Sequence, residues 1–220
     1  MKRIIKREPP ESLETYKKTR GASFDNMPKD VKDELRNSLV EEQGGLCCYC
    51  EKRIWPDHHS VIEHLLPKGN KVYSHLQLEY SNLLCSCDGG EAERKGKTKK
   101  EKRAYPPCCD DKKNDDLIAI TPLNEDCEDY FIYDDEGHIY GKSDAAQETV
   151  DILGLDCSTL VNKRKAAIDA YSDLRLTEAE WSSIVDGLYQ RDQDGLFLPF
   201  CIAVIFYIQH YKMSLVGVAS

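Results

Sequence analysis

Residues 44–67 read GGLCCYCEKRIWPDHHSVIEHLLP, and this stretch decides how the chain folds. Cys47 and Cys50 have the C-x-x-C spacing that lets two thiolates reach one tetrahedral Zn²⁺ ion. Two more cysteine pairs follow, at 85 and 87 and at 108 and 109, so one thiolate from each can complete a four-thiolate site. The spacing predicts a structural zinc ion held by Cys47, Cys50, Cys87 and Cys109. Three neighbours could exchange roles with these four: Cys48, Cys85 and Cys108.

Ordinary buried thiols are the alternative interpretation, because free cysteine is among the most buried residue types. Seven of the ten cysteines lie between residues 47 and 109, however, which random burial does not produce. An iron–sulfur cluster is a second alternative, but a closed four-cysteine site on short loops is more often structural zinc. The first residues, MKRIIKREPPESLETYKK, contain no apolar stretch typical of a signal peptide. We therefore expect a cytoplasmic protein, since clustered cysteines in a reducing compartment bind metal more often than they pair.

Polar residues with catalytic potential lie between the cysteine pairs. Glu63 and His64 stand near the end of an expected strand. There a carboxylate can bind a divalent metal ion while an imidazole reaches a water molecule beside a phosphate. Asn82, in the stretch SNLLCSC, is expected to hold His64 in a productive orientation. The plainer interpretations are a surface Glu-His pair and an ordinary turn asparagine, and the position between zinc ligands argues against them.

A third polar group follows the last cysteine pair, in CCDDKKND at residues 108–115. Either Asp110 or Asn114 can supply an oxygen ligand to Mg²⁺ or Mn²⁺, and the sequence does not choose between them. Lys113 is expected to contact phosphate. His58 and His59 could bind metal or substrate, but two histidines in the loop WPDHHS are more often exposed to solvent.

The charge of the chain is acidic overall but unevenly distributed. A net charge of −9 and a pI near 5.2 argue against a protein that coats nucleic acid with its whole surface. Basic residues nevertheless crowd into residues 94–103, and Lys97, Lys99 and Lys100 are candidates for phosphate contact. The plainer interpretation of this run is a solvated loop.

The hydrophobic pattern divides the chain into three segments, 1–45, 46–142 and 143–220. The first is an extended arm, then a helix capped by Asp25 or Asn26, with Pro28 in its first turn, that Gly44 and Gly45 end. The second contains short strands, including KRIW and SVIEHL, and a hairpin at residues 130–141. The third is helical, and Thr177 with Glu180 forms a capping box. Its apolar stretch at 196–208 is too short to cross a bilayer, so we expect a core helix or, alternatively, a docking surface for a partner.

These residues together resemble the HNH endonuclease pattern with its cysteine knuckle. The blocks that carry the resemblance are GGLCCYC, IEHLLP, NLL and the segment from Cys109 to Lys113. KREPPESLETYKKT, IEHLLPKG, SNLLCSC and PLNEDCEDYFIYDDEGHIYG are similar, more narrowly, to the retron-associated HNH family that includes Septu PtuB. The resemblance covers roughly residues 1–160.

The resemblance implies an α+β fold, with a small zinc-stapled ββα-metal core between the N-terminal helix and the helical C-terminal region. It implies that Glu63 binds the catalytic ion, that His64 is the general base and that Asn82 orients it; Asp110 falls at the variable third position. It also implies a Septu-type ATPase partner resembling PtuA, and in some systems a retron reverse transcriptase with its RNA–DNA product. The alternative function is a zinc-stabilised module that binds nucleic acid or a partner without cleaving anything.

Overall fold

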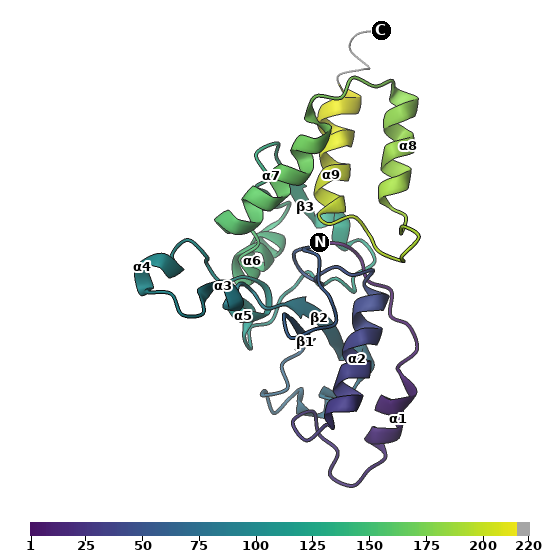
Figure 1. The fold of residues 1–220 in the computed structure, drawn as a ribbon, viewed down its shortest axis with the longest axis vertical. Helices are drawn as coiled ribbons and strands as arrows, with labels where there is room; N and C mark the ends of the chain where they lie inside the picture. Colours follow the sequence, from purple (N-terminus) through teal and green to yellow (C-terminus); the bar gives the residue numbers. More distant parts are fainter. Residues whose placement is uncertain (215–220) are drawn as a thin grey trace.

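The structure, a computed structural model, describes residues 1–214 of the 220-residue chain. The fold is α+β and mostly helical, with two small two-stranded sheets. Figure 1 shows the first sheet beside α1 and α2 at one end of the molecule and the C-terminal helices at the other. The elements of the first half are α1 (Glu11–Lys17), α2 (Lys29–Glu42), β1 (Ser60–His64), β2 (Leu83–Cys87), α3 (Glu91–Arg94), α4 (Lys99–Lys102) and α5 (Cys109–Lys113). Those of the second half are β3 (Phe131–Tyr133), β4 (Ile139–Gly141), α6 (Asp144–Leu153), α7 (Ser158–Ser172), α8 (Glu178–Leu188) and α9 (Cys201–Tyr207).

The strands β1 and β2 pair antiparallel, with Ser60 opposite Cys87 and His64 opposite Leu83. Helix α2 packs on β2 from one side, and the short α5 also contacts β2. The amide of Gln43, just beyond α2, donates to the carbonyl oxygens of Leu46 and Cys85 and accepts from the Cys85 N–H. One buried side chain thus joins the end of α2, the cysteine knuckle and the middle of β2.

Helix α2 confirms the expected helix but not its expected start. Pro28 occupies the N-cap position and no side chain caps the helix, so neither Asp25 nor Asn26 has that role. The helix ends where Gly44 and Gly45 adopt positive φ angles of 60° and 71°, which glycine reaches without steric cost. The expected KRIW strand is reduced to one β-bridge, between Leu46 and Arg53, on either side of the tight turn at residues 48–50 that forms the knuckle.

The N-terminal arm is extended over residues 1–10, as the sequence predicted, but apolar side chains anchor it to the core. Met1, Ile4 and Leu13 are buried in the hydrophobic core. The Ile4 N–H donates to the carbonyl oxygen of Pro122 at 2.7 Å, which ties the arm to a segment far along the chain. Two basic residues also anchor it, since Lys2 pairs with Glu128 and Lys6 with Glu42.

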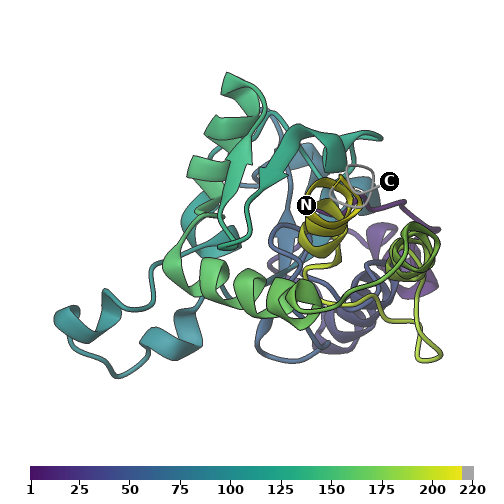
Figure 2. The ribbon, with the colours of Figure 1, turned by 90° about the horizontal axis from the view of Figure 1, so that it is seen from above.

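The C-terminal elements surround α9. The hairpin β3–β4 confirms the expected hairpin, and the expected capping box at the start of α8 is present. Figure 2 looks along α9 and shows α7, α8 and the hairpin around it, in agreement with the contacts among these elements. The buried apolar residues of the arm, the knuckle and these helices form one connected cluster. The segment boundaries at 45/46 and 142/143 stay predictions.

The basic stretch expected to be a loop contains the short helices α3 and α4. Both ribbon views show it projecting from the body of the molecule (Figures 1 and 2). Within residues 1–214, no helix has the length and apolar character that crossing a membrane requires.

Candidate metal centre and active site

Four buried cysteines bring their sulfur atoms together at the centre of the first half of the chain. The Sγ atoms of Cys47, Cys50, Cys87 and Cys109 lie within 4.8 Å of one another. Two come from the knuckle between α2 and β1, one from the end of β2 and one from the start of α5. This quartet is the one that the spacing favoured, and it excludes Cys48, Cys85 and Cys108.

The geometry of the quartet fits a tetrahedral metal ion. A Zn–S distance of about 2.3 Å places neighbouring sulfurs of a tetrahedron about 3.8 Å apart. The Cys47 and Cys109 sulfurs are 3.8 Å apart, and those of Cys50 and Cys87 are 3.9 Å apart. The Cys87 N–H also donates to Cys47 Sγ at 3.2 Å, a contact that stabilises a thiolate. A buried cluster of this kind could hold a structural metal ion such as zinc.

Glu63 points into the protein from β1 and has two strong partners. The Tyr49 hydroxyl donates to its Oε1 at 2.9 Å, and Lys113 Nζ lies 2.9 Å from the same oxygen. The Lys113 side chain is 0% exposed, and it also donates to the backbone carbonyl of His64 at 3.3 Å. These contacts fix one carboxylate oxygen of Glu63.

His64, the last residue of β1, is held in one orientation. Its Nε2 lies 3.1 Å from the carbonyl oxygen of Gln77, and its ring meets the edge of Phe24 with centroids 4.5 Å apart. Because a carbonyl oxygen only accepts hydrogen bonds, Nε2 carries the proton and Nδ1 is left with a free lone pair. Burial lowers the pKa of His64, against the opposing effect of its bond to Gln77, so the ring is poised as a neutral base.

Asn82 acts on the loop around His64, and its side chain has no hydrogen bond to the imidazole. Its Oδ1 accepts from the Leu66 N–H at 2.8 Å, and its Nδ2 donates to the carbonyl oxygens of Leu66 and Leu76. Leu66 follows His64 by two residues, and Leu76 precedes Gln77. The amide therefore clamps both ends of the loop whose carbonyl group orients the imidazole.

A cavity of about 390 Å³ brings the remaining candidates together. Glu63, His64, Asp110 and Asn114 all line it. Burial, together with hydrogen bonding and charge repulsion from Glu63, raises the pKa of Asp110 to about 8, so the two carboxyl groups crowd one another. A divalent cation relieves such crowding, and oxygen donors of this type suit Mg²⁺ and Mn²⁺. Asn114 has φ 47° and turns the chain at the cavity edge.

Lys113 is not placed as the sequence argument expected, since its buried ammonium group pairs with Glu63 and does not face a surface phosphate. Lys99 and Lys100 are exposed on the projecting segment, whereas Lys97 is half-buried there, with its Nζ 5.2 Å from the centroid of the Tyr105 ring. His58 and His59 are exposed in their loop, as the plainer interpretation held.

Sequence reasoning missed three residues that shape the site. Tyr49 lies between two cysteines, where its residue type carries no signal, yet its hydroxyl donates a hydrogen bond to Glu63. Gln77 contributes a backbone carbonyl, which carries no sequence signal. Phe24 reaches the imidazole from the segment before α2.

Comparison with known proteins places this site in a family. No protein-family model matches the chain. The chain is 33% identical over 174 residues to a protein of Vibrio cholerae serotype O1 biovar El Tor named "Retron Vc95 putative HNH endonuclease", across 73% of this chain and 78% of the relative. It is 25% identical over 209 residues to the Septu protein PtuB of Bacillus mycoides (strain KBAB4), across 83% of this chain and 68% of the relative. The cysteine knuckle, the Glu-His strand end and this extent of identity lead to one conclusion: the chain belongs to the HNH-type family of retron and Septu proteins.

Proposed function

We propose that the protein is a metal-dependent HNH endonuclease that hydrolyses phosphodiester bonds of nucleic acid in an anti-phage defence system. The observation that carries this proposal is the cavity that joins His64, Glu63 and Asp110 beside the four-cysteine cluster. In this proposal β1, β2 and α5 form the ββα-metal core. The names of the two relatives support a role in retron or Septu defence.

The four thiolates of Cys47, Cys50, Cys87 and Cys109 would hold a structural zinc ion, which supplies a cross-link between the knuckle, β2 and α5. A cross-link at this point is useful because α5 carries Asp110 and Lys113. It fixes the distance between these side chains and the strand that carries Glu63 and His64.

Glu63 and Asp110, with Asn114 as a further oxygen donor, would hold the catalytic Mg²⁺ or Mn²⁺. When bound, such an ion supplies positive charge that stabilises the developing negative charge of the phosphate and the leaving oxygen. His64 Nδ1 accepts the proton of the attacking water, and the resulting imidazolium is stabilised by the Gln77 carbonyl on Nε2. Asn82 holds the loop that provides this carbonyl, so it is a positioning residue.

A partner ATPase of the Septu type is part of the proposal, because one relative is a Septu PtuB protein. A retron reverse transcriptase with its RNA–DNA product is the additional partner that the retron relative suggests. Either partner would set when, and on which substrate, the cavity acts.

Cleavage by the wild type and by His64→Ala tests the proposal. Plasmid DNA and total tRNA are incubated with each protein in Mg²⁺, with and without the partner ATPase, after equal zinc content is verified. We expect the variant to lose at least about a hundredfold in rate, the usual contribution of a general base. His59→Ala is the matched control, since its ring is exposed outside the cavity, and it should cleave like the wild type. Retained cleavage by His64→Ala would remove this residue from the mechanism.

A zinc-stabilised binding module without catalysis is the second candidate, and the exposed basic segment favours it. That module would bind nucleic acid in a salt-sensitive manner that depends on Lys97, Lys99 and Lys100. It would be indifferent to His64. Absence of cleavage under every condition, together with such binding, would make this the better description.

A further inference from the structure

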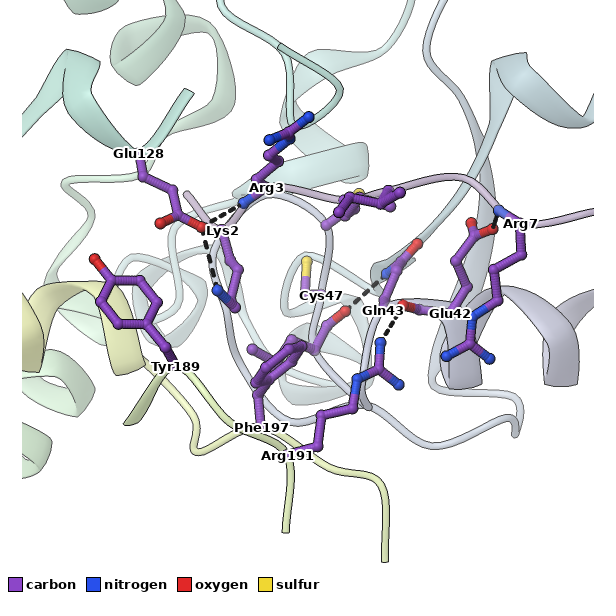
Figure 3. Close-up of a pocket in the computed structure, with 14 residues that line it drawn as sticks. Lys2, Arg3, Arg7, Glu42, Gln43, Cys47, Glu128, Tyr189, Arg191 and Phe197 are labelled. Atoms are coloured by element: carbon purple, nitrogen blue, oxygen red, sulfur yellow. Dashed lines mark hydrogen bonds and ion pairs between the residues drawn. The ribbon is translucent and has the colours of Figure 1, made fainter. Parts of the chain in front are cut away.

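A second cavity, of about 460 Å³, lies away from the catalytic pocket and shares no lining residue with it. The N-terminal arm, the end of α2, the knuckle and the loop before α9 surround it. Figure 3 shows four cationic side chains around its rim, Lys2 and Arg3 on one side and Arg7 and Arg191 on the other. Four cations in one hollow are not expected from composition, because the chain carries a net charge of −9.

Two of these cations have no carboxylate partner among residues 1–214. Arg191 donates to the backbone carbonyl oxygens of Glu41 at 2.7 Å and Glu42 at 2.6 Å, and to that of Gly195. Its charge is fixed in place but not neutralised. Arg7 uses only its backbone N–H, which donates to Glu42. Burial and repulsion from Arg7 lower the pKa of Arg191, against the opposing attraction of Glu42, as expected for two guanidinium groups that line the same cavity.

The two carboxylates of the lining are already engaged. The Glu42 side chain is fully buried and accepts from Lys6 Nζ at 2.5 Å and from the Arg7 N–H at 2.5 Å. Glu128 accepts from Lys2 Nζ at 3.2 Å and from the Arg3 N–H at 2.9 Å. Both carboxylates are therefore paired with lysines, and the four cations of the lining outnumber its two carboxylates, so the hollow presents net positive charge.

Aromatic rings form one wall of the cavity. Phe197 and Tyr189 both line it, and Lys2 Nζ lies 4.7 Å from the first ring centroid and 5.2 Å from the second. The Arg191 guanidinium lies 4.9 Å from the Phe197 centroid. Guanidinium groups match phosphate oxygens in a bidentate fashion, and exposed aromatic faces stack on nucleobases. The volume lies within the range of about 300 to 1,000 Å³ that is usual for small-molecule sites.

We propose that this cavity binds a nucleotide, with the phosphate at Arg7 and Arg191 and the base against Phe197. The same chemistry is offered by two sources: a free nucleoside phosphate, and the 5′-phosphorylated end of a nucleic-acid strand. Both present a phosphate group next to a planar base. Leu46, Cys47 and Cys48 also line the cavity, so its occupant would lie against the cysteine knuckle.

Isothermal titration of the zinc-loaded full chain, without added divalent ion, tests this site independently of cleavage. The probes are ATP, pyrophosphate, and a short DNA oligonucleotide with and without a 5′-phosphate. Arg7→Gln should weaken phosphate-dependent binding about tenfold, the usual effect of losing one charge-assisted contact. Arg20→Gln is the matched control, because Arg20 is exposed and lies outside the cavity. Phe197→Leu should weaken the binding of ATP about fivefold or more and leave the binding of pyrophosphate unchanged.

Each outcome decides the proposal. Tight binding of ATP alone identifies the free nucleotide, and binding of the oligonucleotide only when phosphorylated identifies the strand end. If no probe binds the wild type at about 1 mM, a concentration that detects even weak sites, the cavity is not a nucleotide site. Binding that Arg7→Gln leaves intact would place the ligand elsewhere and overturn the proposal. Equal losses for ATP and pyrophosphate in Phe197→Leu would overturn the role of the base.

Discussion

The ammonium group of Lys113 lies inside the protein, 2.9 Å from Glu63 Oε1. A buried lysine is costly unless it is paired, and so is a buried carboxylate. The two residues offset each other's desolvation, with the Tyr49 hydroxyl as a third partner. In the proposed nuclease, Lys113 would keep the Glu63 carboxylate correctly oriented before a divalent ion arrives.

Replacing Lys113 by Met tests this pairing. The variant leaves Glu63 as an uncompensated buried charge, so we expect the free energy of unfolding to fall by about 3 to 5 kcal/mol in the absence of divalent ions. Added Mn²⁺ should restore part of that loss, since it returns positive charge to the carboxylate. The measurement is chemical denaturation with and without Mn²⁺.

Lys112→Met is the control for that experiment. Lys112 is exposed and makes one hydrogen bond, to the Asp151 carbonyl, so its loss should cost no more than about 1 kcal/mol. Equal stability of the Lys113 and Lys112 variants would show that the buried ion pair contributes nothing specific to the site.

The His64 ring is oriented by a loop carbonyl, and Asn82 holds that loop in place. The sequence predicted that Asn82 holds His64 in a productive orientation; its side chain bonds Leu66 and Leu76, and the role itself stays a prediction. The intermediary could not be read from the sequence, because it is the Gln77 backbone carbonyl and every residue has one.

At the scale of elements, the four sulfurs bring together the knuckle, the end of β2 and the start of α5. Helix α5 is five residues long, too short to be stable alone, and Cys109 begins it with φ 52°. A metal ion at Cys109 would therefore stabilise both the helix and its unusual start.

Cys87→Ser should remove the zinc, because the fourth thiolate comes from the end of β2. Structural zinc contributes on the order of 10 kcal/mol in small zinc-dependent folds, so we expect the variant to lose its cooperative melting transition. Cys85→Ser changes a buried cysteine of the same strand outside the quartet and should keep one zinc ion per chain. Elemental analysis and thermal melting measure both effects. The reverse pattern would transfer the ligand role to Cys85.

Elements with local signals could be predicted from the sequence. The end of α2 follows from Gly44 and Gly45, and the start of α8 from Thr177 and Glu180. Burial of the N-terminal arm could not be predicted, because it depends on partners such as Pro122 that are distant in sequence. The candidate site follows the same rule. Its motifs of fixed spacing, such as the cysteine pairs, could be recognised in the sequence. The pairing of Lys113 with Glu63 could not, because fifty positions separate the two residues.

At the scale of the molecule, α9 connects the C-terminal helices to the cysteine knuckle. The Glu51 carboxylate of the knuckle accepts from the Ile202 N–H at 3.0 Å, and Arg53 donates to the Phe197 carbonyl. Helix α9 also contacts β3, α7 and α8. The apolar stretch therefore belongs to the core, which favours the first of its two expected roles.

Val204→Asp tests whether α9 serves folding or only docking. Val204 is 0% exposed, so the variant places a carboxylate in an apolar core that did not evolve a cationic partner for it. The cost of several kcal/mol is comparable to the total stability of about 5 to 15 kcal/mol of a typical domain, and we expect the cooperative melting transition to be lost. Gln209→Asp, at an exposed position just beyond α9, should melt like the wild type. A Val204→Asp protein that melts normally but no longer co-purifies with the partner ATPase would instead identify α9 as a docking helix. In that case the partner, and not β3, α7 and α8, would supply most of the cover for its apolar side chains.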